Sequence, residues 1–492
     1  MPKYNSTRGE HKNLRCSEAI IKGIAGDKGL YVPDTLPTPD FDLESLKGAS
    51  YQDIACRVMG CYFDDFSSEE LRHCVEHAYD SKFNDPAIVP MNRAGGAYFI
   101  ELYHGSTAAF KDIALSILPY FMTTSVKKEK EDKKIVILVA TSGDTGKAAL
   151  EGFADVPDTD IIVFYPQKGV SKIQELQMTT QEGSNTHVFA VEGNFDDAQT
   201  AVKKIFTDPS AAATLDEKGY RFSSANSINI GRLIPQVVYY VVAYLQLLNE
   251  NAIRSGEKIN IVVPTGNFGN ILAAYYAKTL GIPVGKLICA SNMNKVLTDF
   301  INTGIYDANR NFYVTNSPSM DILISSNLER LLYHLSGNNA EEIRGYMTSL
   351  EKIKRYEVSD KVKSGLQDFY GGFVDVDETN LAIGELYKNT GYLIDTHTAV
   401  AYKVYQDYLR ETGDDTVAII TAAASPYKFA EDVAKSIGLP DEADGFAYER
   451  AINNKTGMKI PGCLEGLDKK PVRHKQVIGK DELLKAVFGS LR

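Results

Sequence analysis

The stretch "KKIVILVATSGDTGKAAL", residues 133–150, contains the pattern on which the fold of this chain depends. An apolar, β-branched run leads into a small polar loop with two glycines, Gly143 and Gly146, and the loop leads into a helical pattern. An uninterrupted apolar run of this length is typical of a strand that is buried on both faces of a sheet.

Similar runs recur along the chain and alternate with helical stretches: "IIVFY" at 161, "HVFAV" at 187, "INIVVP" at 259 and "KLICAS" at 286. This alternation predicts an α/β fold of βαβ units, with open, mostly parallel sheets covered by helices on both faces. We expect an N-terminal accessory domain over residues 1–95, α/β domains over 96–300, a helical insertion or subdomain over 301–390, and a C-terminal part over 391–492.

Composition narrows the classes of function. The 492 residues have a formal net charge of -11, which argues against non-specific binding to nucleic acid or to an anionic membrane. The longest apolar tract, "LIPQVVYYVVAYLQLL" at 233–248, is interrupted by Pro235 and is predicted to be a buried core helix. The polar start "MPKYNSTRGEHKN" has no apolar signal core, so we expect a cytoplasmic protein.

The cysteines and histidines give no sign of a metal site. The six cysteines are scattered without a C-x-x-C pair, which indicates neither a zinc ribbon nor a disulfide framework. His73 and His77 could lie on one helix face, but no third ligand follows at a usual spacing. We therefore expect an amphipathic helix surface there and no bound metal.

The loop at 141–146 does not fit a nucleotide P-loop. That motif requires G-x-x-x-x-G-K-[ST], whereas Thr141 occupies the first glycine position and Ala148 follows Lys147. Two interpretations remain: a loop whose N–H groups and hydroxyls hold an anion, or a tight turn whose glycines permit close packing.

Two further loops provide context. "GNFGN", residues 266–270, lies between a strand and a helix, so its backbone donors converge at a positive helix end that suits a phosphate. In "HGSTAAFKDIALSILPYF", residues 104–121, Lys111 lies at the start of a helix, where the dipole and apolar neighbours would lower its pKa. Such an amine can form a Schiff base, although a surface lysine paired with Asp112 is the alternative.

Taken in this order, "HGSTAAFKD", "SGDTG" and "GNFGN" resemble the threonine synthases, pyridoxal-phosphate enzymes of fold type II with a tryptophan-synthase-like fold. "YNSTRG" and "SEAIIKGIAGDKGLYVP" resemble the accessory domain of the longer bacterial and fungal form. With "NSINIGRLIPQ" and "ASPYKF", the resemblance spans residue 4 to about residue 430. The glycine loops alone are shared with cysteine synthases and dehydratases.

The resemblance implies roles for particular residues and a C-terminal part that completes the cofactor-binding domain. Lys111 would hold pyridoxal 5'-phosphate through a Schiff base and would also transfer protons. The cofactor phosphate would be bound by Gly266, Asn267, Phe268, Gly269 and Asn270. The substrate carboxylate or the cofactor ring oxygen would meet Ser142, Gly143, Asp144 and Thr145.

One motif departs from the family pattern. The late motif is usually T-A-[HS]-P-x-K-F, but Ala423 occupies its threonine position in this chain. The hydroxyl partner of the pyridine nitrogen would then be Ser425 or Thr421, and we favour Ser425.

The implied reaction converts O-phospho-L-homoserine and water to L-threonine and phosphate. An acidic protein needs local cations for the leaving phosphate, and Arg232, Lys147 and Lys428 are the candidates, with Asn229, Ser106 and Thr107 as neutral donors. Arg232 is preferred because its fork can bind phosphate with two hydrogen bonds, although a salt bridge on a core helix is equally compatible with the sequence. His397 either supports the site or packs in the core.

The alternatives are another pyridoxal-phosphate lyase, such as a threonine or serine dehydratase or a cysteine synthase relative, and a catalytically silent cofactor-binding homologue. The accessory domain argues against the first, whereas Lys111 and "GNFGN" argue against the second. The sequence does not indicate the oligomeric state.

Overall fold

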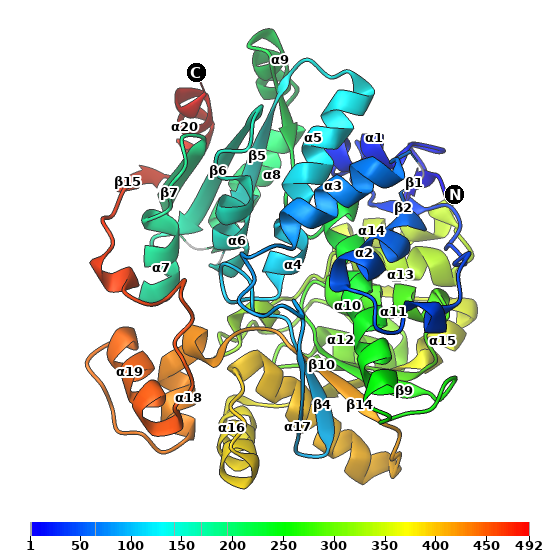
Figure 1. Ribbon diagram of the computed structural model, residues 1–492. Helices are drawn as coiled ribbons and strands as arrows, with labels where there is room; N and C mark the ends of the chain where they lie inside the picture. The colour runs from blue at the N-terminus through cyan, green and yellow to red at the C-terminus, as the bar shows by residue number, and fades with distance from the viewer. Residues whose placement is uncertain (1, 64, 142, 169, 194, 492) are drawn as a thin grey trace.

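Two β-sheets organise the protein in the computed structural model, which describes residues 2–63, 65–141, 143–168, 170–193 and 195–491. Figure 1 shows the five-stranded sheet above the six-stranded sheet, with the short helix α4 (Lys111–Leu115) between them. The α/β fold class expected from the sequence is confirmed.

The five-stranded sheet is entirely parallel, in the order β15-β7-β6-β5-β8. Side chains alternate between its faces: Val136 and Leu138 pack into one hydrophobic cluster, and Ile137 packs into another. Both faces are therefore buried, as a parallel sheet requires. Its strands are β5 (Lys134–Ala140), β6 (Thr159–Pro166), β7 (Thr186–Glu192), β8 (Tyr220–Ser223) and β15 (Gln476–Gly479), and its helices are α5 (Leu118–Glu129), α6 (Asp144–Phe153), α7 (Lys172–Thr179), α8 (Phe195–Thr207), α9 (Pro209–Glu217) and α20 (Leu483–Ser490).

The six-stranded sheet has the order β13-β10-β9-β14-β4-β3, and only β3 runs antiparallel to its neighbour. Along β9, Ile261 and Val263 pack into one hydrophobic cluster and Val262 into another. Its strands are β3 (Met91–Ala94), β4 (Ala97–Glu101), β9 (Ile259–Pro264), β10 (Val284–Ser291), β13 (Phe369–Phe373) and β14 (Ala418–Ala422), and its helices include α10 (Ile230–Asn249), α11 (Gly269–Thr279), α12 (Val296–Thr303), α16 (Val376–Thr390), α17 (Thr396–Thr412) and α18 (Ala430–Ser436).

The region expected to be a helical insertion, residues 301–390, also supplies β13, an edge strand of the six-stranded sheet. Glycines conceal this strand in the sequence, because Gly371 and Gly372 weaken the β pattern. Packing on both faces requires them: a Cβ at Gly371 would lie 2.9 Å from Thr298 Cα, and one at Gly372 would lie 2.6 Å from Val404 Cγ1. The remaining elements here are β11 (Ile305–Asp307), η2 (Pro318–Met320), α13 (Leu328–Leu335), α14 (Ala340–Ile353), β12 (Arg355–Glu357), α15 (Asp360–Gly365) and η3 (Leu366–Asp368).

The N-terminal unit ends earlier than residue 95. Gly95 and Gly96 form the turn between β3 and β4, and both strands belong to the six-stranded sheet, so we place the start of the α/β region at Met91. The C-terminal part contributes to both sheets, with β14 in one and β15 in the other. The N-terminal elements are β1 (Tyr4–Ser6), α1 (Cys16–Lys22), β2 (Tyr31–Pro33), η1 (Leu43–Leu46), α2 (Tyr51–Gly60) and α3 (Ser68–Ala78), and the C-terminal ones are η4 (Pro426–Phe429), α19 (Gly445–Thr456) and η5 (Leu467–Lys469).

Helix α10 is the core helix that the apolar tract predicts. Its length and composition would also suit a membrane span, but 94% of the apolar window is buried inside the protein. Asn229 caps its N-terminus by accepting a hydrogen bond from the N–H of Gly231. The helix packs against α2, α4 and α11, so it connects the N-terminal unit to the elements around Lys111.

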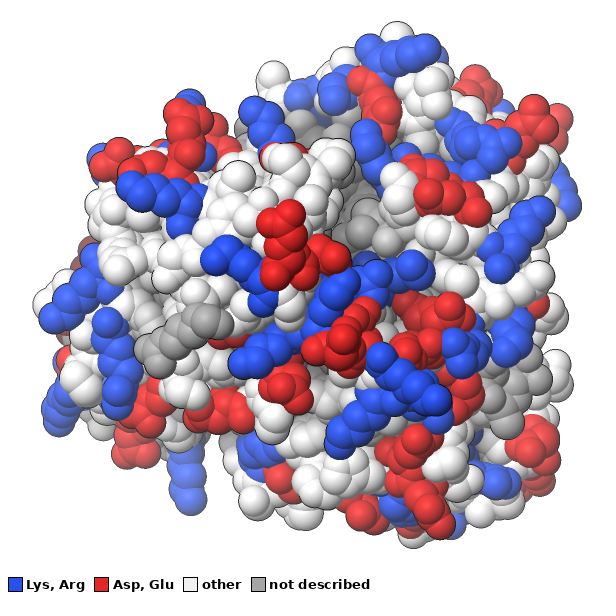
Figure 2. All heavy atoms as spheres, turned by 90° about the horizontal axis from the view of Figure 1, so that it is seen from above, with Lys and Arg blue, Asp and Glu red and all other residues white. Residues whose placement is uncertain are grey.

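The surface seen from above has acidic and basic side chains interspersed (Figure 2). Although acidic residues are in excess, many of them lie beside basic ones in local ion pairs, such as Lys128 with Glu70 and Lys278 with Asp368. Exposed pairs of this kind add little to stability.

An ion pair between the half-buried Arg8 and the buried Glu329 fastens the N-terminal unit to α13. Arg8 donates hydrogen bonds from Nε and Nη2 to the two carboxylate oxygens of Glu329, each at 2.9 Å. Thr7 Oγ1 donates to the same carboxylate at 2.6 Å. Because Glu329 is buried, its charge depends on these partners.

We expect Arg8→Ala to lower the free energy of unfolding by about 3 kcal/mol, because it leaves a buried carboxylate without its cation. Urea denaturation followed by circular dichroism measures this loss. The matched control is Arg410→Ala, whose side chain is 76% exposed and pairs with Asp407, and which should cost less than about 1 kcal/mol. Equal, small losses in both variants would contradict the structural role of the Arg8–Glu329 pair.

Candidate functional site

Lys111 is the first residue of α4 and is buried, with 8% of its surface exposed. Burial lowers the pKa of its amine, Asp144 partly opposes this effect, and Arg232 and Lys428 lower the pKa further. Asp112 is not its partner: that carboxylate accepts hydrogen bonds from Thr107 N at 2.9 Å and from Thr107 Oγ1 at 2.5 Å. The interpretation of Lys111 as a surface lysine paired with Asp112 is therefore wrong.

Asp144 lies between two buried amines at the start of α6. Its carboxylate is 2.8 Å from Lys428 Nζ and 3.9 Å from Lys111 Nζ, and it accepts a hydrogen bond from Gln174 Nε2 at 3.0 Å. Although burial alone would raise the pKa of Asp144, the two lysines hold it well below the usual range. Asp144 is thus a fixed negative charge beside the amine of Lys111.

The segment before Lys111 is clamped to the late motif. Phe110 N donates to the carbonyl of Ala423 at 2.8 Å, and Ser425 N donates to the carbonyl of Ala108 at 3.0 Å. Ala108 has a φ of 58°, a conformation that a residue with a side chain rarely adopts. These contacts bring the segment at the end of β14 beside the start of α4.

Residues Gly266–Asn270, which we call the phosphate loop, follow β9 and include the first two residues of α11. None of their N–H groups donates to an acceptor in the part of the chain that the structure describes. A Cβ at Gly266 would lie 2.6 Å from the carbonyl oxygen of Ser319, so only glycine fits there. The side chain of Asn270 is bound within the protein, because its Oδ1 accepts hydrogen bonds from the hydroxyls of Tyr239 and Tyr240. Free N–H groups at a helix N-terminus fit an anionic group such as a phosphate.

The loop at 141–146 is organised by a threonine side chain. Thr141 Oγ1 accepts hydrogen bonds from Gly143 N at 3.0 Å and Gly146 N at 2.9 Å. The N–H groups of Asp144 and Thr145 have no acceptor among the described residues. These two N–H groups remain available to an anion. Ser142, which is also predicted to meet the substrate carboxylate or the cofactor ring oxygen, lies outside the described residues.

Arg232 lies in the first turn of α10, buried near Lys111. It donates one hydrogen bond from Nη1 to the carbonyl of Ala225 at 2.9 Å, while its buried Nε has no partner among the described residues. Burial lowers the pKa of Arg232 to about 10, so the group keeps its charge at neutral pH. No carboxylate pairs with it within the described chain, which makes it a buried cation with unused donors rather than half of a salt bridge.

Other predicted residues are engaged elsewhere. Asn229 Nδ2 donates to the carbonyls of Ile20 and Ser224, so this side chain joins α10 to α1. Lys147 pairs with Glu151 and Gln181. The hydroxyl of Thr107 binds Asp112, and the half-buried Ser106 has no polar partner for its hydroxyl among the described residues.

The two hydroxyl candidates of the late motif differ in their partners. Thr421 Oγ1 donates to the carbonyl of Val262 at 3.3 Å. Ser425 Oγ accepts a long hydrogen bond of 3.4 Å from Tyr427 N, and its own proton has no acceptor among the described residues. Ser425 is also the residue that is tied to Ala108, so the structure favours it over Thr421 as a free donor near Lys111.

Sequence reasoning missed several residues of this region. Arg330 is fully buried and donates to the carbonyls of Tyr31 and Ile228, and to Asn327 Oδ1. Asn327 in turn donates from Nδ2 to the carbonyl of Asn267 at 2.9 Å, so a chain of contacts runs from β2 to the phosphate loop. The charged helical stretch around Arg330 gave no signal for this role.

Ser319 and Gln177 are further residues that the sequence did not indicate. Ser319 Oγ accepts a hydrogen bond from Lys111 Nζ at 3.4 Å, and Gln177 Oε1 accepts one from Lys428 Nζ at 2.7 Å. Lys428 itself was named only as one of three candidate cations. Its family motif, "ASPYKF", was the signal that could have ranked it higher.

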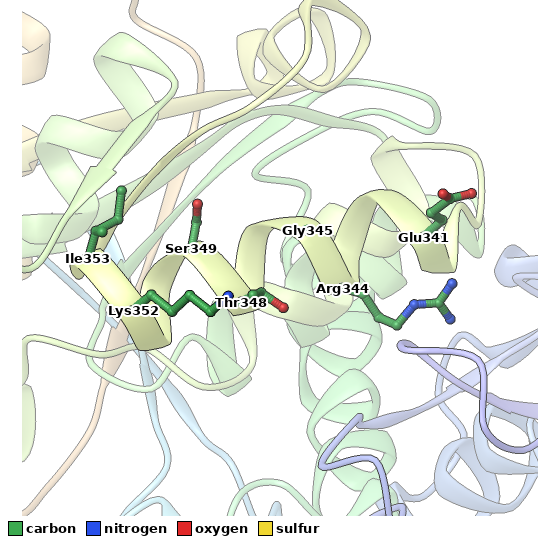
Figure 3. A pocket seen from close by; sticks show the side chains of 7 residues that line it. All are labelled: Glu341, Arg344, Gly345, Thr348, Ser349, Lys352 and Ile353. Atoms are coloured by element: carbon green, nitrogen blue, oxygen red, sulfur yellow. The ribbon is translucent and has the colours of Figure 1, made fainter.

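A shallow hollow on the surface runs along α14 and contains none of the predicted site residues (Figure 3). All its lining residues come from this one helix, and Arg344 reaches from it toward the N-terminal segment, where it donates to the carbonyl of Arg8 at 2.6 Å. A hollow along one helix, without convergent polar groups from other elements, does not have the form of an active site.

Comparison with protein families matches most of the chain. Residues 3–79 match the family model of the threonine synthase N terminus, and residues 92–422 match that of the pyridoxal-phosphate-dependent enzymes. The first match covers the N-terminal unit, and the second covers both sheets up to the end of β14.

Individual relatives agree with the family models. The human protein threonine synthase-like 1 is 40% identical over 439 residues, which are 86% of this chain and 58% of that protein, so the chain spans little more than half of its length. Threonine synthase from Schizosaccharomyces pombe is 36% identical over 90% of both chains. The solved structure of threonine synthase from yeast has a TM-score of 0.88 at 32% identity and covers 99% of this chain and 98% of its own. The structure of pyridoxal-phosphate-bound threonine synthase from Brucella melitensis has a TM-score of 0.87 at 34% identity and covers 100% of both.

The resemblance noted in the sequence is thus confirmed along nearly the whole chain, in identity and in three dimensions. This chain belongs to the threonine synthase family of pyridoxal-phosphate-dependent enzymes.

Proposed function

We propose that this protein is a threonine synthase, which converts O-phospho-L-homoserine and water to L-threonine and phosphate. The observation that supports this most directly is the presence of two separate anion-binding groups beside one buried amine. The phosphate loop offers free N–H groups, and Arg232 and Lys428 offer buried cations near Lys111. The phosphate of the cofactor would occupy the phosphate loop, and the phosphate of the substrate would occupy the site beside the buried cations.

Pyridoxal 5'-phosphate would be held by Lys111 through its amine, by the N–H groups of Gly266 to Asn270 at its phosphate, and by Ser425 at its ring nitrogen. The fit rests on the absence of side-chain bulk at Gly266 and on the uncommitted proton of Ser425. When bound, this cofactor supplies the electron sink that loss of a proton from the substrate carbons requires.

The protein residues would bind the substrate and move its protons. The N–H groups of Asp144 and Thr145 would receive the substrate carboxylate, and Arg232 would receive the phosphate that leaves Cγ. Lys428 is not a direct phosphate ligand, because its three N–H groups are bound by Asp144, Gln177 and Thr107. Lys111, once free, would act as a base toward Cα and Cβ, because burial favours its neutral form. Burial around Lys111 also excludes bulk water, which strengthens each of these interactions.

A substrate panel tests this function. The holoenzyme should release phosphate and form threonine from O-phosphohomoserine. Release of ammonia from threonine or serine would instead indicate a dehydratase, and sulfide-dependent formation of cysteine would indicate a cysteine synthase. A cytoplasmic location and the lack of nucleic-acid or membrane partners stay predictions.

Lys111→Ala should abolish both the visible absorbance of bound pyridoxal phosphate and turnover, because no other buried amine occupies its position. Borohydride reduction followed by mass spectrometry should place the label on Lys111 in the unaltered protein. The matched control is Lys172→Ala, an exposed lysine that pairs with Glu175, which should keep colour and activity. A coloured, active Lys111→Ala protein would contradict the assignment.

Arg232→Ala should raise the KM for O-phosphohomoserine about ten- to hundredfold, because a charge-assisted hydrogen bond to phosphate contributes about 1.5–3 kcal/mol. The visible absorbance of the cofactor should not change. Arg232→Lys, which keeps the charge but loses the fork, should give an intermediate KM. An unaltered KM in Arg232→Ala would remove this residue from the substrate site.

Asp144→Asn should shift the pH dependence of cofactor uptake to lower pH. The Asp144 carboxylate raises the pKa of Lys111, so its loss lets burial and the nearby cations lower that pKa further, and the free amine forms at lower pH. The rate at which visible absorbance appears after pyridoxal phosphate is added to the apoprotein, measured between about pH 5 and pH 9, tests this shift. Asp407→Asn, which breaks a pair with Lys403 on α17, is the control and should leave the curve in place.

A further inference from the structure

The turn η2 contacts three parts of the site at once through Ser319. Its hydroxyl accepts a hydrogen bond from Lys111 Nζ at 3.4 Å. Its N–H donates to His397 Nε2 at 3.2 Å. Its carbonyl oxygen lies close to Gly266, since a Cβ at Gly266 would be only 2.6 Å from it. The turn therefore also packs directly on the phosphate loop.

His397 is held in one orientation by Asp395, the N-cap residue of α17. Asp395 Oδ2 lies 2.9 Å from His397 Nδ1 and accepts the N–H of His397, also at 2.9 Å. The backbone N–H of Ser319 can only donate, so Nε2 must accept, and the ring proton must be on Nδ1, facing the carboxylate. Both ring nitrogens are thereby assigned, and the imidazole is buried against Phe429 with 4.7 Å between the rings.

Neighbouring contacts hold the same turn in place. Thr396 Oγ1 donates to the carbonyl of Asn316 at 2.6 Å, and Asn292 Nδ2 donates to Ser317 Oγ at 3.0 Å. These anchors fix the backbone of the turn, and the hydrogen bond from Ser319 N–H to His397 is the contact made by Ser319 itself.

We propose that Ser319 is a further residue of the site, whose hydroxyl orients the Lys111 amine while that amine is free, and that His397 is a positioning residue that fixes Ser319. An amine that donates one N–H to Ser319 Oγ keeps its lone pair free to accept a proton. A fixed hydrogen-bond direction therefore orients the base of the reaction.

This inference rests on Lys111 binding the cofactor, as proposed above, but it does not depend on which amino acid is the substrate. Nothing in the sequence motifs around Lys111 or the phosphate loop points to Ser319. Its role follows only from the contacts that α17, η2 and α4 make in the folded chain.

The test compares Ser319→Ala, His397→Leu, the double variant and His397→Gln in the holoenzyme. We expect Ser319→Ala to lower kcat about three- to tenfold with KM within about twofold, as loss of one neutral hydrogen bond predicts. His397→Leu should give a similar loss, and the double variant should be no worse than the more impaired single variant, because both changes remove one coupled contact. His397→Gln keeps an acceptor for Ser319 N–H and should recover most of the activity.

A spectroscopic readout separates this role from a general structural one. The pH midpoint of the visible absorbance of bound pyridoxal phosphate reports on the nitrogen of Lys111. It should move in the same direction in Ser319→Ala and His397→Leu. It should stay fixed in two control variants, Ser336→Ala and His334→Leu, whose side chains bond to Tyr333 and Tyr276 away from Lys111.

Two results would overturn the inference: an unmoved midpoint with unaltered kcat in Ser319→Ala, or losses that add in the double variant. If His397→Leu does not fold, Ser319→Ala and His397→Gln decide the question by the same two readouts. Failure of the proposed function can be distinguished from failure of this inference. The midpoint can be measured in any protein that binds the cofactor at Lys111, even one that does not convert O-phosphohomoserine.

Discussion

The carboxylate of Asp144, placed between the amines of Lys111 and Lys428, is the interaction on which the rest of the site depends. Three basic side chains lie buried in this region, since Arg232 is close enough to lower the pKa of Lys111 as well. Asp112, a second buried carboxylate, has a pKa raised to about 6 by burial and is bound by Thr107. Basic side chains therefore gather in this interior, although the whole protein is acidic. Such a local group of basic side chains attracts anionic ligands.

The two sheets deliver these groups from the carboxyl ends of parallel strands. β5 ends at Ala140 and leads to the loop that presents Asp144, while β9 ends at Pro264 and leads to the phosphate loop. β14 ends at Ala422, and the residues after it clamp the segment before Lys111. Ligands of open α/β sheets bind at such strand ends, because free N–H groups and helix N-termini meet there. The arrangement explains how loops that are far apart in the sequence form one site.

Those parts of the fold and of the site that depend on a continuous stretch of residues could be predicted from the sequence. Long apolar strands such as β5 and β9 are visible because burial on both faces demands continuous hydrophobic residues. Lys111 and the phosphate loop are weak signals taken singly, and they are identified through the motifs that contain them, which together resemble those of one family. β13 was not visible, since the close approach of Thr298 and Val404 requires glycines that hide a strand.

Contacts between segments that are distant in the chain could not be predicted from the sequence. Asn229 has the chemistry of a substrate ligand, but its amide is engaged with Ile20 and Ser224, and only the docking of α1 decides that. The preference for Ser425 over Thr421 likewise depends on the partner that β9 offers to Thr421. Ser319 and Arg330 lie in stretches without any motif, so their proximity to Lys111 and the phosphate loop emerges only from the fold.

The link from Arg330 to Tyr31 has a consequence for how the chain is made. The two residues are 299 positions apart, and Thr7 is 322 positions from Glu329, so the N-terminal unit leaves the ribosome long before its buried partners exist. At synthesis rates of about 5–20 residues per second, that interval is roughly 15–60 s. During it, the carbonyl of Tyr31 and the hydroxyl of Thr7 lack the partners that they have in the folded protein. The N-terminal unit is therefore synthesised well before α13 but completes its native contacts only after α13 has been made, and nascent chains interrupted before α13 should be clients of chaperones.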